Sequence, residues 1–289
     1  MGSVISENDQ KILNSYAATM QAAGKENATH PRDPATQLRD YRATMLKINP
    51  YKFPPGFKPK AVASFEPTRE LRPGMTAALS IPNGKGPFPM LIHGHGHGLR
   101  AGRPPEYEPW IREMSSYGFV VIFPDYRWQT EATYEDQIAD MLFAIKWAKD
   151  NAGKIQGDAQ RLVLGGDSAA GALSFDVLLR TLADPNGPRF KAFASVDGTI
   201  TMAATGPGKN LIADLKPEIP LPPIFMVVGS ADRLASHSIA AAQKFLEIRK
   251  NYDLAIFYGM PHDFAKFPLL DAMKVANRQM MEFLKKAVA

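Results

Sequence analysis

Ser168 lies between small residues at a predicted strand-to-helix corner, where its hydroxyl could act as a nucleophile. The apolar run 162–164 predicts a short buried strand, Gly165 and Gly166 follow it, and a helical pattern begins directly after the serine. Such a turn is too tight for bulky neighbours, and it aims the first amides of the helix at the group under attack. The stretch predicts a nucleophile elbow, although an ordinary turn that carries a surface serine has the same composition.

Asp232 and His262 supply the two further groups that a serine nucleophile needs. They follow predicted strands at residues 224–228 and 254–258. A serine hydroxyl is a weak nucleophile until an imidazole takes its proton, and a buried carboxylate holds that imidazole in the productive tautomer. We therefore predict a catalytic triad of Ser168, His262 and Asp232.

Two other aspartates compete for the position of the acid. Asp197 follows the preceding strand, whereas Asp263 adjoins the histidine and is badly placed to bond its Nδ1 atom. Asp232 could instead cap a helix that starts near Ser236. We favour Asp232 as the acid because the three residues then follow three strands in the order serine, aspartate, histidine.

A His-Gly repeat runs from His93 to Gly98, directly after another short apolar strand. Glycines let the backbone approach a substrate so that amides can meet a developing negative oxygen. We expect the amides of His95, Gly96 and Ala169 to form this oxyanion hole. The alternating histidines also suggest metal ligands, but zinc would need a further histidine or carboxylate set, so we expect no metal.

Four further side chains are candidates for contact with the substrate. An apolar pocket beneath an N-terminal cap would be lined in part by Trp110, Met202 and Met260, and His97 lies beside the predicted oxyanion loop. Ordinary core packing is the alternative interpretation of the apolar members of this set.

The composition is that of an ordinary globular protein. The chain has 289 residues, 45% hydrophobic and 22% charged, with a net charge of +5 and no cysteine. Scattered basic residues predict no nucleic-acid partner. The absence of cysteine excludes disulfides, thiolate metal sites and a cysteine nucleophile. We see neither a signal peptide nor an apolar run of about 18 residues, so we expect a cytoplasmic protein without stable membrane insertion.

Strands alternate with helices along most of the chain, which predicts a parallel α/β sheet that starts with an antiparallel hairpin. Residues 1–60 are expected to form a helical cap or accessory layer, and 61–289 the catalytic domain, with a possible short lid at 197–222. The predicted strands are 61–66, 75–81, 88–92, 119–123, 162–164, 192–196, 224–228 and 254–258. The predicted helices are 5–23, 36–48, 134–151 and 236–249, with others that begin at Pro109, after Ser168 and at Pro268.

The chain resembles the hormone-sensitive-lipase-like esterases of the α/β-hydrolase fold over roughly residues 75–285. The motifs that carry the resemblance are His93-Gly94-His95-Gly96, Asp125-Tyr126-Arg127, Gly166-Asp167-Ser168-Ala169-Ala170, Asp232-Arg233-Leu234 and His262-Asp263-Phe264. The resemblance implies a serine carboxylesterase with an N-terminal helical cap, no metal and no organic cofactor.

Two positions depart from the family pattern. His95 stands where the oxyanion motif has a glycine, so the family's oxyanion donors transfer less directly to this chain. Ala170 replaces the last glycine of the elbow, a small change because the start of a helix tolerates a methyl group. The imidazole of His95 could project toward the acyl pocket or the cap.

Other functions are compatible with the same motifs. We expect a small or medium ester or lactone substrate and a possible homodimer. An acyltransferase, or a lactone-forming or lyase-type biosynthetic enzyme, would keep the triad and use His95 and His97 for an extra proton transfer. A non-catalytic small-molecule receptor is disfavoured because such proteins typically lose a triad member, whereas all three are present here.

Overall fold

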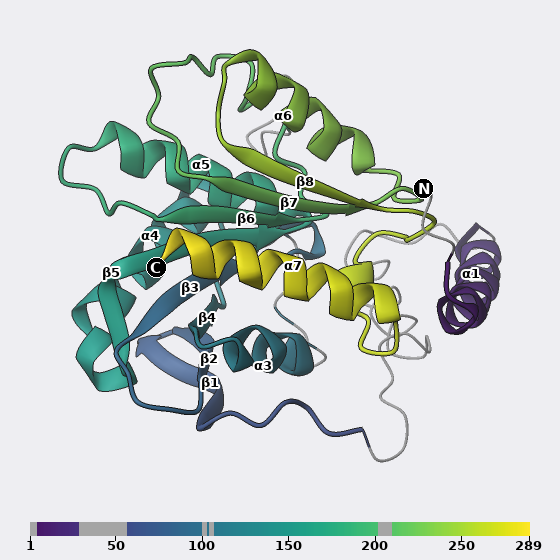
Figure 1. Cartoon of the computed structure of the whole chain (residues 1–289), viewed down its shortest axis with the longest axis horizontal. Helices are drawn as coiled ribbons and strands as arrows, with labels where there is room; N and C mark the ends of the chain where they lie inside the picture. Colours follow the sequence, from purple (N-terminus) through teal and green to yellow (C-terminus); the bar gives the residue numbers. More distant parts are fainter. Residues whose placement is uncertain (1–4, 29–56, 100–102, 104–106, 202–209) are drawn as a thin grey trace.

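The computed structural model describes residues 5–28, 57–99, 103, 107–201 and 210–289. These residues form an eight-stranded sheet that is covered by helices on both faces (Figure 1). The order of the strands is β1-β2-β4-β3-β5-β6-β7-β8. The strands are β1 Ser64–Arg72, β2 Met75–Ile81, β3 Phe88–Gly94, β4 Val120–Pro124, β5 Gly157–Asp167, β6 Ala192–Val196, β7 Ile224–Gly229 and β8 Tyr252–Phe257.

The sheet begins antiparallel and becomes parallel. β2 pairs antiparallel with both β1 and β4, and every later pair of neighbours is parallel. The predicted mostly parallel sheet with an initial hairpin is therefore confirmed. The parallel strands β3, β4, β6 and β7 are buried almost throughout, as expected for strands with helices on both sides.

The helices form two layers, one on each face of the sheet (Figure 1). α4, α5 and α6 pack on one face, and α3 and α7 pack on the other. The helices are α1 Glu7–Ala28, α3 Glu108–Ser116, α4 Tyr134–Asp150, α5 Ala169–Ala183, α6 Ala235–Glu247 and α7 Asp271–Ala287. α4 starts at a capping box in which Thr133 and Asp136 bond each other's backbone amides, so its start follows from local sequence.

α7 begins at Asp271, later than the predicted start at Pro268. The side chain of its N-cap residue, Leu270, does not cap it; instead Asp9 of α1 accepts hydrogen bonds from the amides of Asp271 and Ala272, at 2.8 and 3.1 Å. An aspartate at this place also favours the positive end of the helix dipole. The start of the last helix is thus completed by a residue 262 positions away.

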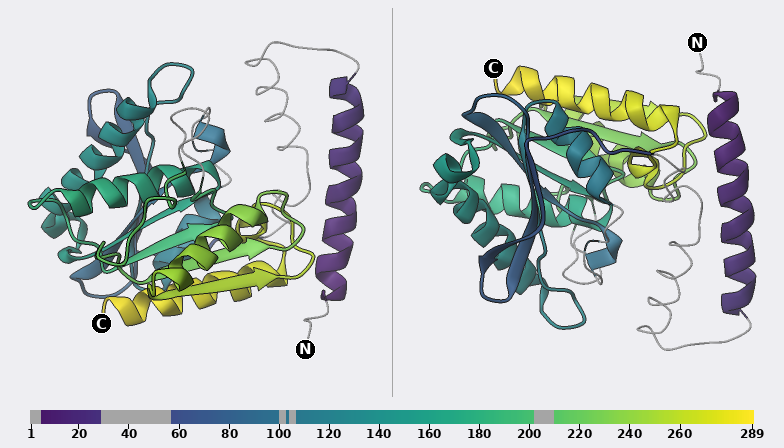
Figure 2. Two further views of the ribbon diagram at one scale, coloured as in Figure 1. Left: turned by 90° about the horizontal axis from the view of Figure 1, so that it is seen from above. Right: turned by 90° about the horizontal axis from the view of Figure 1, so that it is seen from below.

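The N-terminal helix α1 stands beside the N-terminal end of α7 (Figure 2). Tyr16 packs its ring against Phe267, with 5.7 Å between the ring centroids. The predicted helix at 36–48 and residues 202–209 of the predicted lid lie outside the described residues. In the part of the chain that is described, no helix is both long and apolar enough to cross a bilayer.

Candidate active site

Ser168 lies in a strained turn between β5 and α5. Its backbone has φ 52° and ψ −127°, a region that residues other than glycine rarely adopt. A Cβ at Gly166 would collide with the carbonyl oxygen of Ala170, so the approach of the helix to the strand requires glycine there. Small residues are therefore needed around this serine, as the sequence pattern suggested.

The side chain of Ser168 contacts His262, and His262 contacts Asp232. Ser168 Oγ lies 2.8 Å from His262 Nε2, and His262 Nδ1 lies 2.8 Å from Asp232 Oδ2. The carboxylate fixes the proton on Nδ1, which leaves Nε2 to accept the serine proton. The structure thus brings together the three residues that were predicted as a triad.

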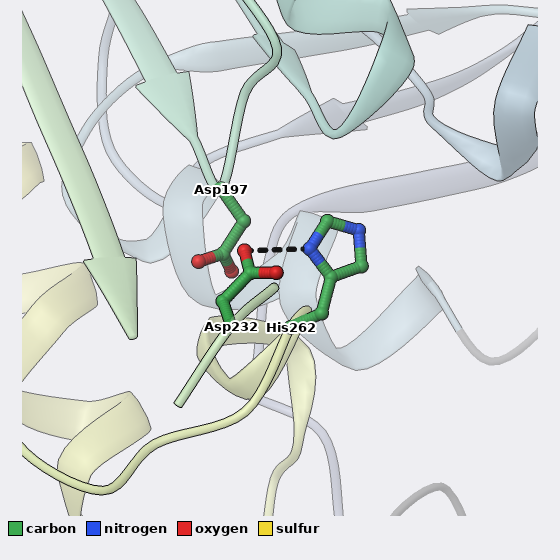
Figure 3. Close-up of side chains that lie close together, drawn as sticks. All are labelled: Asp197, Asp232 and His262. Atoms are coloured by element: carbon green, nitrogen blue, oxygen red, sulfur yellow. Dashed lines mark hydrogen bonds and ion pairs between the residues drawn. The ribbon is translucent and has the colours of Figure 1, made fainter. Parts of the chain in front are cut away.

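The competing aspartates occupy different places around the imidazole. Figure 3 shows Asp197 beside Asp232, with the dashed contact of His262 going to Asp232. Both oxygens of Asp197 accept backbone amides instead, from Gly229 at 3.1 Å and Asp263 at 3.0 Å. Asp232 is therefore the aspartate with a hydrogen bond to Nδ1.

Negative charge around the imidazole changes two pKa values. Burial lowers the pKa of His262, but the nearby carboxylates of Asp263, Asp232 and Asp197 outweigh it and raise this pKa to about 9. Burial raises the pKa of Asp197 to about 7, and the neighbouring carboxylates of Asp263 and Asp232 act in the same direction. The imidazole is therefore largely protonated at neutral pH, and only its neutral fraction has an Nε2 atom that can accept a proton.

The predicted oxyanion donors are not equivalent. The amide of Gly96 donates to Asp167 Oδ2 at 3.0 Å, so it is already engaged in the structure. Ala169 is the first residue of α5, where backbone amides lack partners within the helix. The carbonyl of His95 accepts a hydrogen bond from the Tyr126 hydroxyl, which fixes the course of the loop at this point.

The imidazoles of His93 and His95 are both buried among aromatic rings. His93 stacks on Phe123, and His95 stacks on Tyr126 with 4.4 Å between centroids and 9° between planes. Burial lowers the pKa of His95 to about 3, so this side chain is neutral at physiological pH. The expectation that its imidazole projects toward the acyl pocket or the cap therefore does not agree with its position.

The candidate substrate residues have different surroundings. Trp110 is 2% exposed in the core beside α7, and its indole N–H donates to Asn277 Oδ1 at 3.0 Å. Met260 is also buried in that core. These contacts correct the expectation of a pocket lining for both residues, because core packing already encloses them. His97 is half-buried beside Tyr107, and Met202 lies outside the described residues.

A buried charged cluster behind the nucleophile was not predicted. Lys266 places its Nζ 2.8 Å from Asp167 Oδ2, and Tyr107 donates its hydroxyl to the same oxygen at 2.8 Å. Burial alone would raise the pKa of Asp167, but the positive charge of Lys266 helps to hold it well below its usual range. The one available signal was a lysine between apolar neighbours, in Phe264-Ala265-Lys266-Phe267.

One group in the described part of the chain has ligand atoms close enough to share a metal ion. It consists of Asp197, Asp232 and His262, whose atoms lie within 4.8 Å of one another. Asp232 already holds the imidazole, and Asp197 already accepts two amides, so these atoms are engaged in the hydrogen bonds described above.

Comparisons with known proteins match this architecture. A family profile for the alpha/beta hydrolase fold matches residues 91–216. Hormone-sensitive lipase from Homo sapiens is 29% identical over 46% of this chain, and carboxylesterase NlhH from Mycobacterium tuberculosis is 32% identical over 35% of it. The matches span only 12% and 32% of those proteins, so this chain corresponds to a part of each.

A solved structure extends the likeness to nearly the whole chain. A hormone-sensitive lipase from a metagenome library superposes with a TM-score of 0.76, at 18% identity, and the match covers 99% of this chain and 100% of that one. At this identity the likeness establishes the fold. The resemblance predicted from the sequence motifs is confirmed.

Proposed function

The chain is an α/β hydrolase similar to hormone-sensitive lipases and carboxylesterases, and from this premise we propose that it hydrolyses carboxylic esters with Ser168 as nucleophile. The observation that carries the proposal is the pair of 2.8 Å contacts that connect Ser168, His262 and Asp232. The relatives named as a lipase and a carboxylesterase support the same class of reaction.

In the first half of the reaction, Ser168 Oγ attacks the ester carbonyl carbon while its proton passes to His262 Nε2. The carbonyl oxygen becomes an oxyanion, and we assign its stabilisation to the amides of Ala169 and His95. His262 then gives the proton to the leaving alcohol as the bond between the carbonyl carbon and the alcohol oxygen breaks. The acyl group remains on the serine as an ester.

In the second half, water replaces the alcohol. His262 takes a proton from water, and the resulting oxygen nucleophile attacks the acyl carbon. Collapse of the second oxyanion breaks the bond to Ser168 Oγ, which recovers its proton from His262. Asp232 stabilises the imidazolium that forms in both halves, without becoming protonated itself. The products are the carboxylic acid and the free enzyme.

The substrate that we propose is a small or medium ester or lactone. In α1, Tyr16 contacts Phe267, which follows His262 by only five residues in the loop after β8. This contact supports an N-terminal cap over the site. The buried and neutral imidazole of His95 gives no support to an extra proton transfer by this side chain, one of the two that the lyase-type alternative would use.

The proposal is tested with p-nitrophenyl esters from acetate to palmitate, on the wild-type protein and on Ser168→Ala. We expect hydrolysis of some of the esters by the wild type and loss of turnover in the variant, with an unchanged thermal unfolding curve. Phenylmethylsulfonyl fluoride should label Ser168 in the wild type. A folded Ser168→Ala variant with near-normal activity would refute the proposal, and a competing alcohol acceptor in the assay separates acyl transfer from hydrolysis.

A further inference from the structure

We propose that Lys266 is a positioning residue for this reaction: it joins the turn that carries Ser168 to the loop that carries His262, and it balances the charge of Asp263. The proposal rests on the proposed esterase function. It concerns a side chain that does not touch the reacting atoms and acts through its two aspartate partners.

The ammonium group of Lys266 lies inside the protein, between two carboxylates. Its Nζ is 2.8 Å from Asp167 Oδ2, 2.6 Å from Asp263 Oδ1 and 2.8 Å from the Tyr107 hydroxyl oxygen. The residue is only 4% exposed, and its cation also faces the rings of Tyr107 and Trp110. A lysine is almost never buried to this degree unless its charge is paired.

One partner of Lys266 directly precedes the nucleophile. Asp167 occupies the position before Ser168, and its Oδ2 also accepts the amide of Gly96. The same carboxylate therefore connects the elbow, the oxyanion loop and Lys266. Ser168 is the N-cap residue of α5, and the hydrogen bonds of Asp167 Oδ2 go to Gly96, Tyr107 and Lys266.

The other partner of Lys266 directly follows the base. Asp263 adopts a left-handed backbone with φ 66°, and its amide donates a hydrogen bond to Asp197 Oδ2. Its Oδ1 lies 3.6 Å from His262 Nε2, the nitrogen that exchanges protons with the serine. Burial acts to raise the pKa of Asp263, but Lys266 and His262 outweigh it, so the pKa is lowered and the group is a carboxylate.

The charges around His262 explain why the carboxylate of Asp263 needs a cation beside it. Three carboxylates face the imidazole: Asp232 and Asp197 from the loops after β7 and β6, and Asp263 from its own loop. Each favours the protonated ring, which cannot accept the serine proton. The positive charge of Lys266 offsets the negative charge of Asp263. Among the residues that the structure describes, Lys266 also has Asp167, Tyr107 and His93 as charged or titratable neighbours.

Stability alone is a weak reason to retain such a cluster. Buried ion pairs lose much of their attraction to desolvation, and apolar replacements of similar size are often neutral or stabilising. A cluster that spans the nucleophile turn and the histidine loop has a geometric consequence instead. Misplacement of reacting groups by about 1 Å can cost on the order of 10²-fold in rate.

The test compares Lys266→Met, Asp263→Asn and the double variant with the wild type. Lys274→Met is the matched control, because Lys274 pairs with Asp271 at 2.8 Å on the exposed side of α7. The pKa of His262 is measured by NMR titration of its ring proton, assigned by its loss in His262→Asn. The pH dependence of kcat and kcat/KM is measured with p-nitrophenyl acetate, and thermal unfolding reports the fold.

We expect Asp263→Asn to lower the pKa of His262 by about one unit, since a nearby carboxylate typically shifts a pKa by at least this amount. Lys266→Met should raise this pKa and lower kcat at least about 10-fold. In the double variant the pKa of His262 should lie closer to the wild-type value. Lys274→Met should match the wild type in both the pKa of His262 and kcat.

A folded Lys266→Met variant whose His262 titration does not move to higher pH overturns the proposal. If Lys266→Met does not fold, Asp263→Asn decides, because it leaves the contact between Lys266 and Asp167 in place; an unchanged titration there also overturns the proposal. Failure of the wild type to hydrolyse any ester would instead defeat the proposed function. The NMR titration would still test the link between Lys266 and His262.

Discussion

Asp232 holds His262 with one carboxylate oxygen and closes its own turn with the other. Oδ2 lies 2.8 Å from His262 Nδ1, while Oδ1 accepts the amide of Leu234 at 2.8 Å. The aspartate is buried, so both oxygens have defined partners and the imidazole is held from a rigid point. The local turn and the proposed catalytic role therefore use different atoms of one side chain.

This arrangement predicts unequal effects for the two neighbouring aspartates. Asp232→Asn should reduce kcat by roughly 10⁴-fold, because an amide nitrogen toward Nδ1 stabilises the wrong tautomer. Asp197→Asn should keep at least about a tenth of the activity, since it removes an acceptor for a backbone amide rather than the partner of the imidazole. Steady-state kinetics of the two purified variants make the comparison, and equal losses would contradict this choice of acid.

The pH dependence of the wild type should follow the raised pKa of His262. Because the neutral imidazole is the base, kcat/KM should rise with pH, with a midpoint at about 9. The folded pKa exceeds the ordinary value of 6.5, so the stability from the charged imidazole is present below about pH 6.5 and is lost as pH rises through about 9. Kinetics and thermal unfolding from pH 6 to 10 measure both trends; a plateau of kcat/KM from pH 7 would show that the base titrates normally.

Two glycines of the His-Gly repeat should respond differently to alanine. A Cβ at Gly96 would lie 2.6 Å from Asp167 Oδ2 and 2.8 Å from the Cβ of Ser168, so Gly96→Ala should lower kcat by on the order of 10²-fold. At Gly98 no described atom lies within 4 Å, and the substitution should cost only about 1–2 kcal/mol of stability from its φ of +64°. Similar kcat values for the two variants would count against the close packing around Ser168.

The contact between Asp9 and α7 should contribute measurably to stability. Asp9→Ala removes the acceptor for two amides at the start of α7 and should lower the free energy of unfolding by about 1 kcal/mol. Lys11→Ala, at an exposed position of the same helix, is the control. Urea unfolding of both variants gives the comparison, and an equal effect would mean that Asp9 has no capping role.

The sequence predicted the fold well where apolar residues form a continuous run or a helical stripe. β4, β6 and β7 are buried at every residue, and the buried residues of α4 recur at helical spacing, so local sequence reports both. The start of β5 was missed because Gly157–Arg161 lacks an apolar run, although β5 begins at Gly157 and pairs there with Phe88 of β3. The start of α7 was misplaced because its cap comes from another helix.

The site was predictable to the extent that its residues follow strands. Parallel strands bring their carboxyl ends to one edge, which is why Ser168, Asp232 and His262 could be placed together from their order alone. Lys266 was missed because its partner Asp167 is 99 residues away, and no local pattern tells a buried lysine from an exposed one. Trp110 was given a place in the pocket because an aromatic residue has the same local signal in a core and in a binding site.

The pairing of Asp9 with α7 also sets an order of events during synthesis. The first turn of α1 emerges 262 residues before the helix end that it completes, a delay on the order of tens of seconds at typical translation rates. During that time Tyr16 also lacks Phe267, the ring that it packs against in the finished protein. The N-terminal helix therefore completes these two contacts only after the first turn of α7 has been made.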